Sequence, residues 1–164
     1  MPEKSKTRCD QILRDTKHVG ALPLAMIFFW VIKLTKATIY HNPKCSKSRD
    51  ALRFLSDSGI EATIVLYLEA GWTAELLQEL KGSSGLDWKH MLRPDAQSDL
   101  EDALAENDSG TIIQYLIDRP AGLERPFVVT GKGTRLCRPL EAIFEITDRR
   151  PQAPWLTEKG VKVV

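Results

Sequence analysis

The stretch ATIYHNPKCSKSR, residues 37–49, places a cysteine where a β-strand is expected to give way to a helix. Residues 37–40 are apolar and β-branched in part, and Ala51, Leu52 and Leu55 then recur at helical spacing. The first turn of a helix presents unpaired N–H groups, which favour a thiolate and also attract an oxyanion. The stretch therefore predicts a nucleophile and an anion-binding site at one strand-to-helix junction.

The neighbours of Cys45 favour a reactive thiolate over the alternative, a small buried side chain that serves only packing. Lys44, Lys47 and Arg49 surround it with positive charge, and the nearby chain offers no apolar residue until Ala51. Cations beside a cysteine favour its ionised form, which is the nucleophilic one. His41 has two open roles, because it can hold the thiolate by charge or simply orient the loop.

Length and composition place the chain among globular proteins with a core that needs no disulfide or metal. It has 164 residues, 43% of them hydrophobic and 27% charged, and its net charge is +1. This balance predicts no general basic surface for nucleic acid. The three cysteines, Cys9, Cys45 and Cys137, are too few for a disulfide framework and lack the spacing of a zinc site. We therefore expect a cytoplasmic protein and no metal.

Residues 1–36 differ from the rest and are interpreted as an atypical N-terminal extension. They are basic, with seven Lys or Arg against three Asp or Glu, and they include the apolar run 21–32. That run is shorter than the about 20 residues of a membrane-spanning helix, and no signal-peptide cleavage pattern follows it. A non-native extension is the preferred interpretation, with a weak membrane anchor as the alternative, and no stable membrane insertion is expected.

The remaining pattern predicts an α/β domain over residues 37–146 and a C-terminal tail with weak signals of order over 147–164. Apolar runs predict a second, buried strand and a later pair of strands, and apolar spacing predicts several helices between them. The predicted strands are 37–40, 63–67, 127–130 and 134–137; the predicted helices are those after Cys45, at 73–82, 88–92 and 112–117, and from Pro139 to 146. This order matches a thioredoxin-like mixed sheet with a helical insertion between its βαβ and ββα halves. In that architecture the proline before the third strand, here Pro126, is typically cis.

Several motifs together resemble the glutaredoxin-coupled arsenate reductases. The active-site loop matches at residues 40–43 and at Cys45, Ser48 and Arg49. Further matches, at consistent separations, are LYL at 66–68, LR at 92–93, RPFVVT at 125–130 and GTRLCRP at 133–139. The resemblance covers residues 37–146 and leaves the N-terminal 36 residues unaccounted for.

The resemblance implies a role for each matching residue. Cys45 would attack arsenate, and His41 would help to keep that cysteine ionised. Arg93, Arg125 and Arg138 would bind the oxyanion, which suits the bidentate, charge-assisted hydrogen bonds of guanidinium groups. Each arginine taken alone is more often part of a surface ion pair. Asn42, Ser48 and Arg49 would support the loop.

The source of electrons is expected to lie outside the chain. A dithiol enzyme would carry a second cysteine where Ser48 stands, so the resemblance implies glutathione as co-substrate and glutaredoxin as partner, with no bound cofactor and a monomeric protein. Cys137 as an internal thiol stays open. Two other functions also stay open: a glutathione-dependent thiol-transfer enzyme of the same fold, and an Spx-like transcriptional regulator. The phosphatase-like arsenate reductases are excluded, because they need an arginine at the position of Ala51.

Overall fold

The computed structural model describes residues 36–164. The predicted N-terminal extension and its apolar run lie outside these residues. Within residues 36–164, no helix has both the length and the apolar character needed to cross a membrane.

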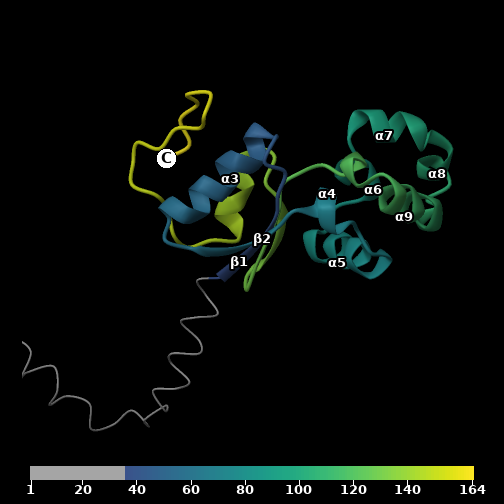
Figure 1. The fold of residues 1–164 in the computed structure, drawn as a ribbon, viewed down its shortest axis with the longest axis horizontal. Coiled ribbons are helices and arrows are strands. Elements are labelled where there is room, and N and C mark those ends of the chain that lie inside the picture. The colour runs from purple at the N-terminus through teal and green to yellow at the C-terminus, as the bar shows by residue number, and fades with distance from the viewer. Residues whose placement is uncertain (1–35) are drawn as a thin grey trace, which may run out of the picture. The chain divides into compact units, whose positions relative to one another are not determined.

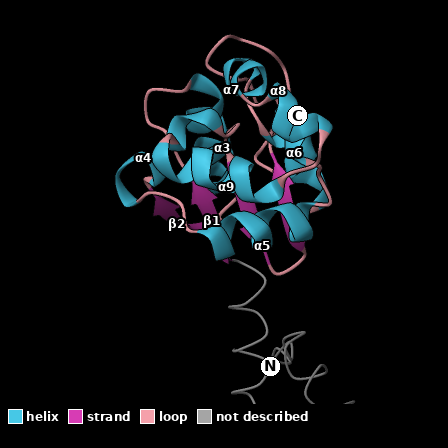
Figure 2. Cartoon of the chain, turned by 90° about the vertical axis from the view of Figure 1, so that its right-hand side faces the viewer, coloured by secondary structure: helices cyan, strands magenta, loops and turns pink. Residues whose placement is uncertain are grey.

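A four-stranded mixed sheet forms the centre of the fold, as predicted. Its strands are β1 (Lys36–Tyr40), β2 (Glu61–Val65), β3 (Phe127–Thr130) and β4 (Gly133–Leu136), in the order β2-β1-β3-β4. β1 runs parallel to β2, and their arrowheads point the same way in Figure 2. β3 is antiparallel to both β1 and β4.

Helices cover both faces of this sheet (Figure 1). α3 (Ser46–Asp57) and the 3-10 helix η2 (Leu140–Glu145) pack on one face. The other face carries the helical insertion, which follows β2 and ends before β3. Its elements are α4 (Tyr67–Ala70), α5 (Ala74–Ser84), α6 (Trp88–Met91), α7 (Pro94–Asp99), α8 (Glu101–Ala105), α9 (Ser109–Asp118) and η1 (Pro120–Gly122).

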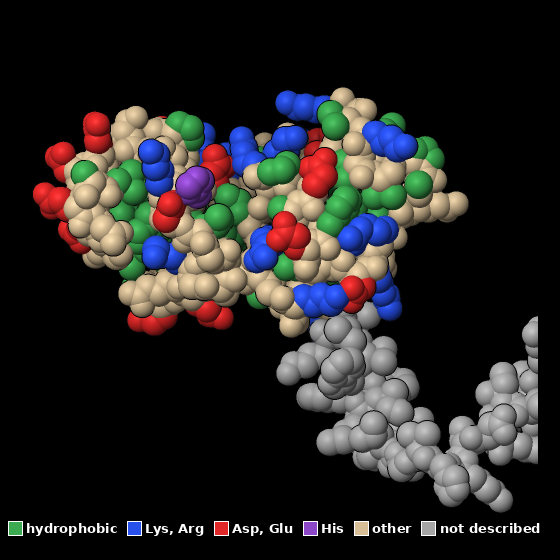
Figure 3. Space-filling view, turned by 180° about the vertical axis from the view of Figure 1, so that it is seen from behind, with side chains coloured by type: hydrophobic (Ala, Val, Ile, Leu, Met, Phe, Trp, Pro, Cys, Tyr) green, Lys and Arg blue, Asp and Glu red, His purple; other side chains and the backbone are tan. Residues whose placement is uncertain are grey.

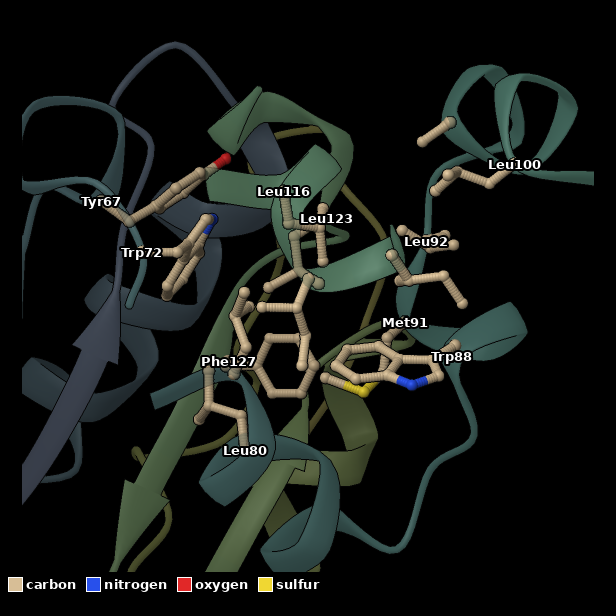
Figure 4. Packing of buried hydrophobic residues seen from close by; sticks show 14 of the residues in the cluster. Tyr67, Trp72, Leu80, Trp88, Met91, Leu92, Leu100, Leu116, Leu123 and Phe127 are labelled. Carbon is tan, nitrogen blue, oxygen red and sulfur yellow. The ribbon is translucent and has the colours of Figure 1, made fainter. Parts of the chain in front are cut away.

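The alternation of side chains along the strands divides the core in two. Ile39 and Val128 face α3, whereas Tyr40 and Phe127, one residue away on each strand, face the insertion. Figure 4 shows Phe127 among the buried side chains of the cluster on the insertion side, which includes Trp88. The insertion thus has a core of its own that is continuous with the sheet.

Three predicted elements need correction. The second strand is not buried: β2 lies at an edge of the sheet, Ile64 is 49% exposed, and the strand ends at Val65 so that Tyr67 begins α4. The helix predicted at 73–82, which is α5, runs past Gly82 to Ser84, and Gly85 ends it with a φ of 71°. The last helix is a 3-10 helix that Pro139 precedes, and it does not reach residue 146. The predicted cis bond is present at Arg125–Pro126, and a second occurs at Arg138–Pro139.

The C-terminal tail is ordered against α3, contrary to its weak sequence signals. The Trp155 ring meets Phe54 edge to face at 5.4 Å, and its Nε1–H donates to Asp57 Oδ2 at 2.8 Å. Leu156 and Lys162 form an isolated β-bridge. Trp155 lies 98 residues after Asp57 in the sequence, so only the folded chain brings the tail against α3.

Charges of both signs are interspersed over the face drawn in Figure 3. Acidic side chains gather along the outer rim of the insertion on this face, and basic ones lie among them and over the sheet half.

Replacing Trp155 by alanine tests the role of the tail. Trp155 is 5% exposed, so Trp155→Ala should lower the free energy of unfolding by about 3–5 kcal/mol in urea denaturation. Leu156→Ala is the matched control: its side chain is 44% exposed, and the change should stay below about 0.5 kcal/mol. Equal urea midpoints for the two variants would show that the tail contributes nothing to the core.

Candidate functional site

The pairing of the strands brings the candidate site residues to one end of the sheet. Tyr40, the last residue of β1, pairs with Val65 at the end of β2 and with Phe127 at the start of β3. Phe127 in turn pairs with Leu136 at the end of β4. The chain segments next to these four positions carry the residues Cys45, Tyr67, Arg125 and Arg138. The register therefore gathers them at one end of the sheet.

Cys45 occupies the N-cap position of α3, with φ −101° and ψ 118°. The N–H groups of Ser48 and Arg49 donate to its carbonyl at 3.0 Å each. No side chain caps this helix, and no acidic residue stands in its first turn. The cysteine is partly exposed, not buried. The positive end of a 12-residue helix is thus left open at an accessible sulfur.

Ser48 organises the loop that leads into this helix. Its buried hydroxyl accepts the N–H of Asn42 at 3.0 Å and pairs with His41 Nδ1 at 3.0 Å. Asn42 Oδ1 accepts the N–H of Lys44 at 2.9 Å, and the Cys45 N–H donates to the Asn42 carbonyl at 3.0 Å. The loop is therefore held by its own polar groups, among them Asn42 and Ser48.

His41 is 6% exposed, and burial lowers its pKa below the ordinary value. The Arg49 charge adds to this effect, while the hydrogen bond with Ser48 opposes it. A histidine with a lowered pKa is neutral at neutral pH. Of the two roles left open by the sequence, this favours orientation of the loop over a positive charge beside the sulfur.

Arg49 fastens the loop to the C-terminal tail. Its Nε–H and Nη2–H donate to the two carboxylate oxygens of Glu158 at 2.7 Å each, and its Nη1–H donates to the Pro43 carbonyl at 2.7 Å. The Glu158 N–H donates to the buried Asp50 carboxylate at 2.7 Å. Arg49 therefore supports the loop, and much of its charge is balanced by Glu158.

A short antiparallel pairing at Leu92 and Leu123 joins the two segments that carry Arg93 and Arg125. The Arg93 N–H donates to the Gly122 carbonyl at 2.9 Å, and the Glu124 N–H donates to the Met91 carbonyl at 2.8 Å. The Arg93 side chain is 34% exposed and lies 3.6 Å from Asp95. The Arg125 Nε atom is buried and has no hydrogen-bond partner. A buried guanidinium N–H without a partner is rare, and it leaves a donor free for a ligand.

Arg138 is held differently from the other two arginines. The Cys137 N–H donates to the Pro126 carbonyl at 2.8 Å, which fixes the Arg138 backbone next to the Arg125–Pro126 bond. Its Nη1 atom lies 3.4 Å from Glu124 Oε2 but forms no hydrogen bond there. The side chain is 44% exposed. Arg138 thus lies at the site edge with a carboxylate beside it.

Tyr67 links the cysteine to two of the arginines. Burial raises the pKa of Tyr67, and the charges of Arg125, Cys45 and Arg93 also act on its phenol, as does the Asn42 amide. These groups therefore all act on one phenol, although they come from three separate parts of the chain. In the sequence, Tyr67 lies in the predicted strand 63–67 and in a matching motif, and it has no predicted role at the site.

Sequence analysis also missed Glu124 and Glu158, and no sequence signal identifies either of them. Each is found only through its partner in space, which is Arg138 for Glu124 and Arg49 for Glu158. In the part of the chain that the structure describes, no group of three or more His, Cys, Asp or Glu is placed to hold a metal ion.

Comparisons with known proteins agree on one family. The model of the ArsC family matches residues 40–146. The arsenate reductase of Escherichia coli (strain K12) is 38% identical over 133 residues, which covers 80% of this chain and 94% of that protein. The arsenate reductase of Rhizobium meliloti (strain 1021) is 34% identical over 131 residues, or 77% of this chain and 92% of that protein. The structure of an arsenate reductase from Vibrio cholerae matches with a TM-score of 0.58 and 35% identity, over 68% of this chain and 98% of that one.

The buried, neutral His41 predicts a loss of stability in mild acid. Its folded-state pKa lies below 6.5, so the unfolded chain binds this proton more readily. The stability contributed by neutral His41 is fully present above pH 6.5 and falls as the pH drops below that value. His41→Gln should therefore flatten the dependence of the free energy of unfolding on pH between about 7.5 and 5.5, measured by urea denaturation.

His90→Gln is the control for this measurement, since the His90 side chain is 70% exposed in α6. It should not flatten the slope, since the His90 ring is not buried and lies 2.6 Å from the Asp87 carboxylate. If His41→Gln also keeps that slope, His41 titrates alike in the folded and unfolded chains, and its burial has no effect on protonation.

Proposed function

The chain belongs to the ArsC family, and we propose that it reduces arsenate to arsenite with Cys45 as the nucleophile and glutathione and glutaredoxin as the source of electrons. The observation that carries this proposal is the strand register, which brings the segments of Cys45, Tyr67 and Arg125 to one end of the sheet. The charges of Cys45, Arg125 and Arg93 all act on the Tyr67 phenol there. A thiol-transfer enzyme of the same fold would need the cysteine but not the arginines. The family match and the arginines together favour an oxyanion as substrate.

The site suits attack of a thiolate on an anionic substrate. Arsenate carries negative charge at neutral pH and would repel a thiolate. The open N-terminus of α3 favours negative charge on Cys45, and guanidinium donors neutralise the oxyanion and fix its orientation. Negative charge develops on the arsenate oxygens in the transition state. Hydrogen-bond donors that are already in place to stabilise this charge lower the activation barrier, commonly by several kcal/mol for sites of this kind.

In the proposed reaction, the Cys45 thiolate forms a bond to arsenic and an arsenate oxygen leaves as water after protonation. External thiols then supply two electrons, which reduce arsenic from the +5 to the +3 state and release arsenite. The two thiols that give up these electrons finish as a disulfide. Water then replaces the Cys45 sulfur on arsenic, so the arsenic–sulfur bond breaks and Cys45 returns to its free form.

Cys137 supports an external source for these electrons. It is fully buried, and burial raises its pKa to about 12. Its thiol points to the Arg135 carbonyl at 3.7 Å. A thiol with so high a pKa is not ionised at neutral pH and is a poor attacking group. A monomer acting in the cytoplasm, where glutathione keeps thiols reduced, completes the proposal.

Substitution of the two cysteines tests the mechanism. Cys45→Ser should abolish arsenite production from arsenate in the presence of glutathione and glutaredoxin. Cys137→Ala, the matched control, should retain most of the activity because this thiol takes no part. Full activity in Cys45→Ser would refute the nucleophile, and loss of activity in a folded Cys137→Ala protein would make Cys137 the internal thiol. A normal rate with thioredoxin as the only reductant would overturn the assigned electron source.

Arg138→Ala tests oxyanion binding. A hydrogen bond to a charged group contributes about 1.5–3 kcal/mol, so the KM for arsenate should rise roughly tenfold to a hundredfold while kcat changes less. Arg119→Ala is the control, since Arg119 pairs with Asp99 in the insertion at 3.1 Å. If both variants have the KM of the wild type, Arg138 does not bind the substrate.

A further inference from the structure

The phenol of Tyr67 is a buried polar group without a partner. Tyr67 is 1% exposed, and its hydroxyl makes no hydrogen bond in the structure. Buried hydroxyl groups are nearly always paired, because losing water without gaining another hydrogen bond is unfavourable. The Arg125 Nε atom is a second buried donor without a partner. Two such donors close to one cysteine call for a common explanation.

Packing prevents Tyr67 from turning towards water. Its ring stacks on Trp72, with the ring centroids 4.8 Å apart and the planes at 19°, and Figure 4 shows the two rings face to face. The Trp72 Nε1–H donates to the Pro120 carbonyl at 3.1 Å, which ties the stacked pair to η1. Tyr40 packs against the same tryptophan at 5.3 Å. The hydroxyl is therefore held in one place by rigid neighbours.

The groups around the Tyr67 hydroxyl are of the kind that favour a bound anion. Arg125 and Arg93 act on the phenol with positive charge, and Cys45 acts on it from the loop before α3. The Asn42 amide also acts on the phenol and lowers its pKa, as a hydrogen-bond donor does, but no group accepts the phenolic proton. Tyr67 itself begins α4 two residues after the end of β2, and so lies at the same end of the sheet as Cys45 and Arg125.

We propose that Tyr67 is an oxyanion-binding residue, whose hydroxyl donates a hydrogen bond to an oxygen of the tetrahedral substrate while the substrate lies between Cys45 and the guanidinium groups. This inference rests on the proposed function, since it takes arsenate as the anion. The bound oxygen would give the phenol the partner that it lacks, and a second oxygen would do the same for Arg125 Nε. Burial keeps the pKa of Tyr67 above its ordinary value, so the phenol stays protonated and can donate.

Tyr67→Phe is the decisive variant, because it removes only the hydroxyl and keeps the ring that stacks on Trp72. The free protein should keep or slightly raise its Tm, since an unpaired buried polar group is lost. The KM for arsenate should rise roughly tenfold or more while kcat changes less, as expected when binding energy is lost equally from ground and transition states.

A second measurement needs no turnover. Arsenate should protect Cys45 from alkylation by iodoacetamide, followed at this residue by mass spectrometry without added thiol. The arsenate concentration for half protection should rise in Tyr67→Phe by the same factor as the KM. Tyr115→Phe is the matched control: it removes a hydroxyl that donates to Asp99 at 2.7 Å in the insertion, and should leave both values unchanged.

The outcomes separate this proposal from the function on which it rests. If the wild type reduces arsenate and arsenate protects Cys45, but Tyr67→Phe behaves like the wild type, the role of Tyr67 is refuted and the function stands. If arsenate neither reacts nor protects in the wild type, both are refuted. A Tm well below that of the wild type would show that the hydroxyl has a partner in the free protein, and would also overturn the proposal.

Discussion

The pairing of β1 with a strand on each side is the constraint on which the rest of the structure depends. Tyr40 is the position where both pairings end, because Val65 and Phe127 lie opposite it. A slip of one residue would exchange Ile39 and Tyr40 between the two faces of the sheet, and with them the two core clusters. The burial of both faces therefore determines the register, and the register determines which segments meet beside Cys45.

The polar groups at the end of the sheet near Cys45 fall into two sets, one hydrogen-bonded and the other without partners. In the loop before α3, the buried hydroxyl of Ser48 joins His41 and Asn42, and this set is fully paired. Across from it, Tyr67 Oη and Arg125 Nε are buried and unpaired. A paired network makes a rigid loop, whereas unpaired donors held in place are ready for a ligand. The protein thus holds a hydrogen-bonded loop before Cys45 together with two buried donors that have no partner.

The helical insertion is part of the site and not an appendage to the sheet. It supplies Arg93, whose backbone is bonded to Gly122 just ahead of β3, and it supplies the Trp72 ring that holds Tyr67. Its apolar cluster includes Phe127 of β3, so the insertion shares a core with one face of the sheet. The C-terminal tail has a comparable effect on the other side, since Glu158 fastens Arg49 and, through it, the Pro43 carbonyl.

The sequence by itself determined the strands, the strand-to-helix junction at Cys45, and Cys45, Arg93, Arg125 and Arg138 as candidate site residues. These depend on local pattern and on motifs, which are readable along the chain. Only the tertiary structure decided that β2 is an exposed edge strand, that His41 is buried and neutral, that the tail packs on Phe54, and that Tyr67 lacks a partner. The physical reason is that burial, charge and hydrogen-bond partners depend on neighbours in space. Such neighbours can lie far apart in the chain, as Glu158 does at 109 residues from Arg49.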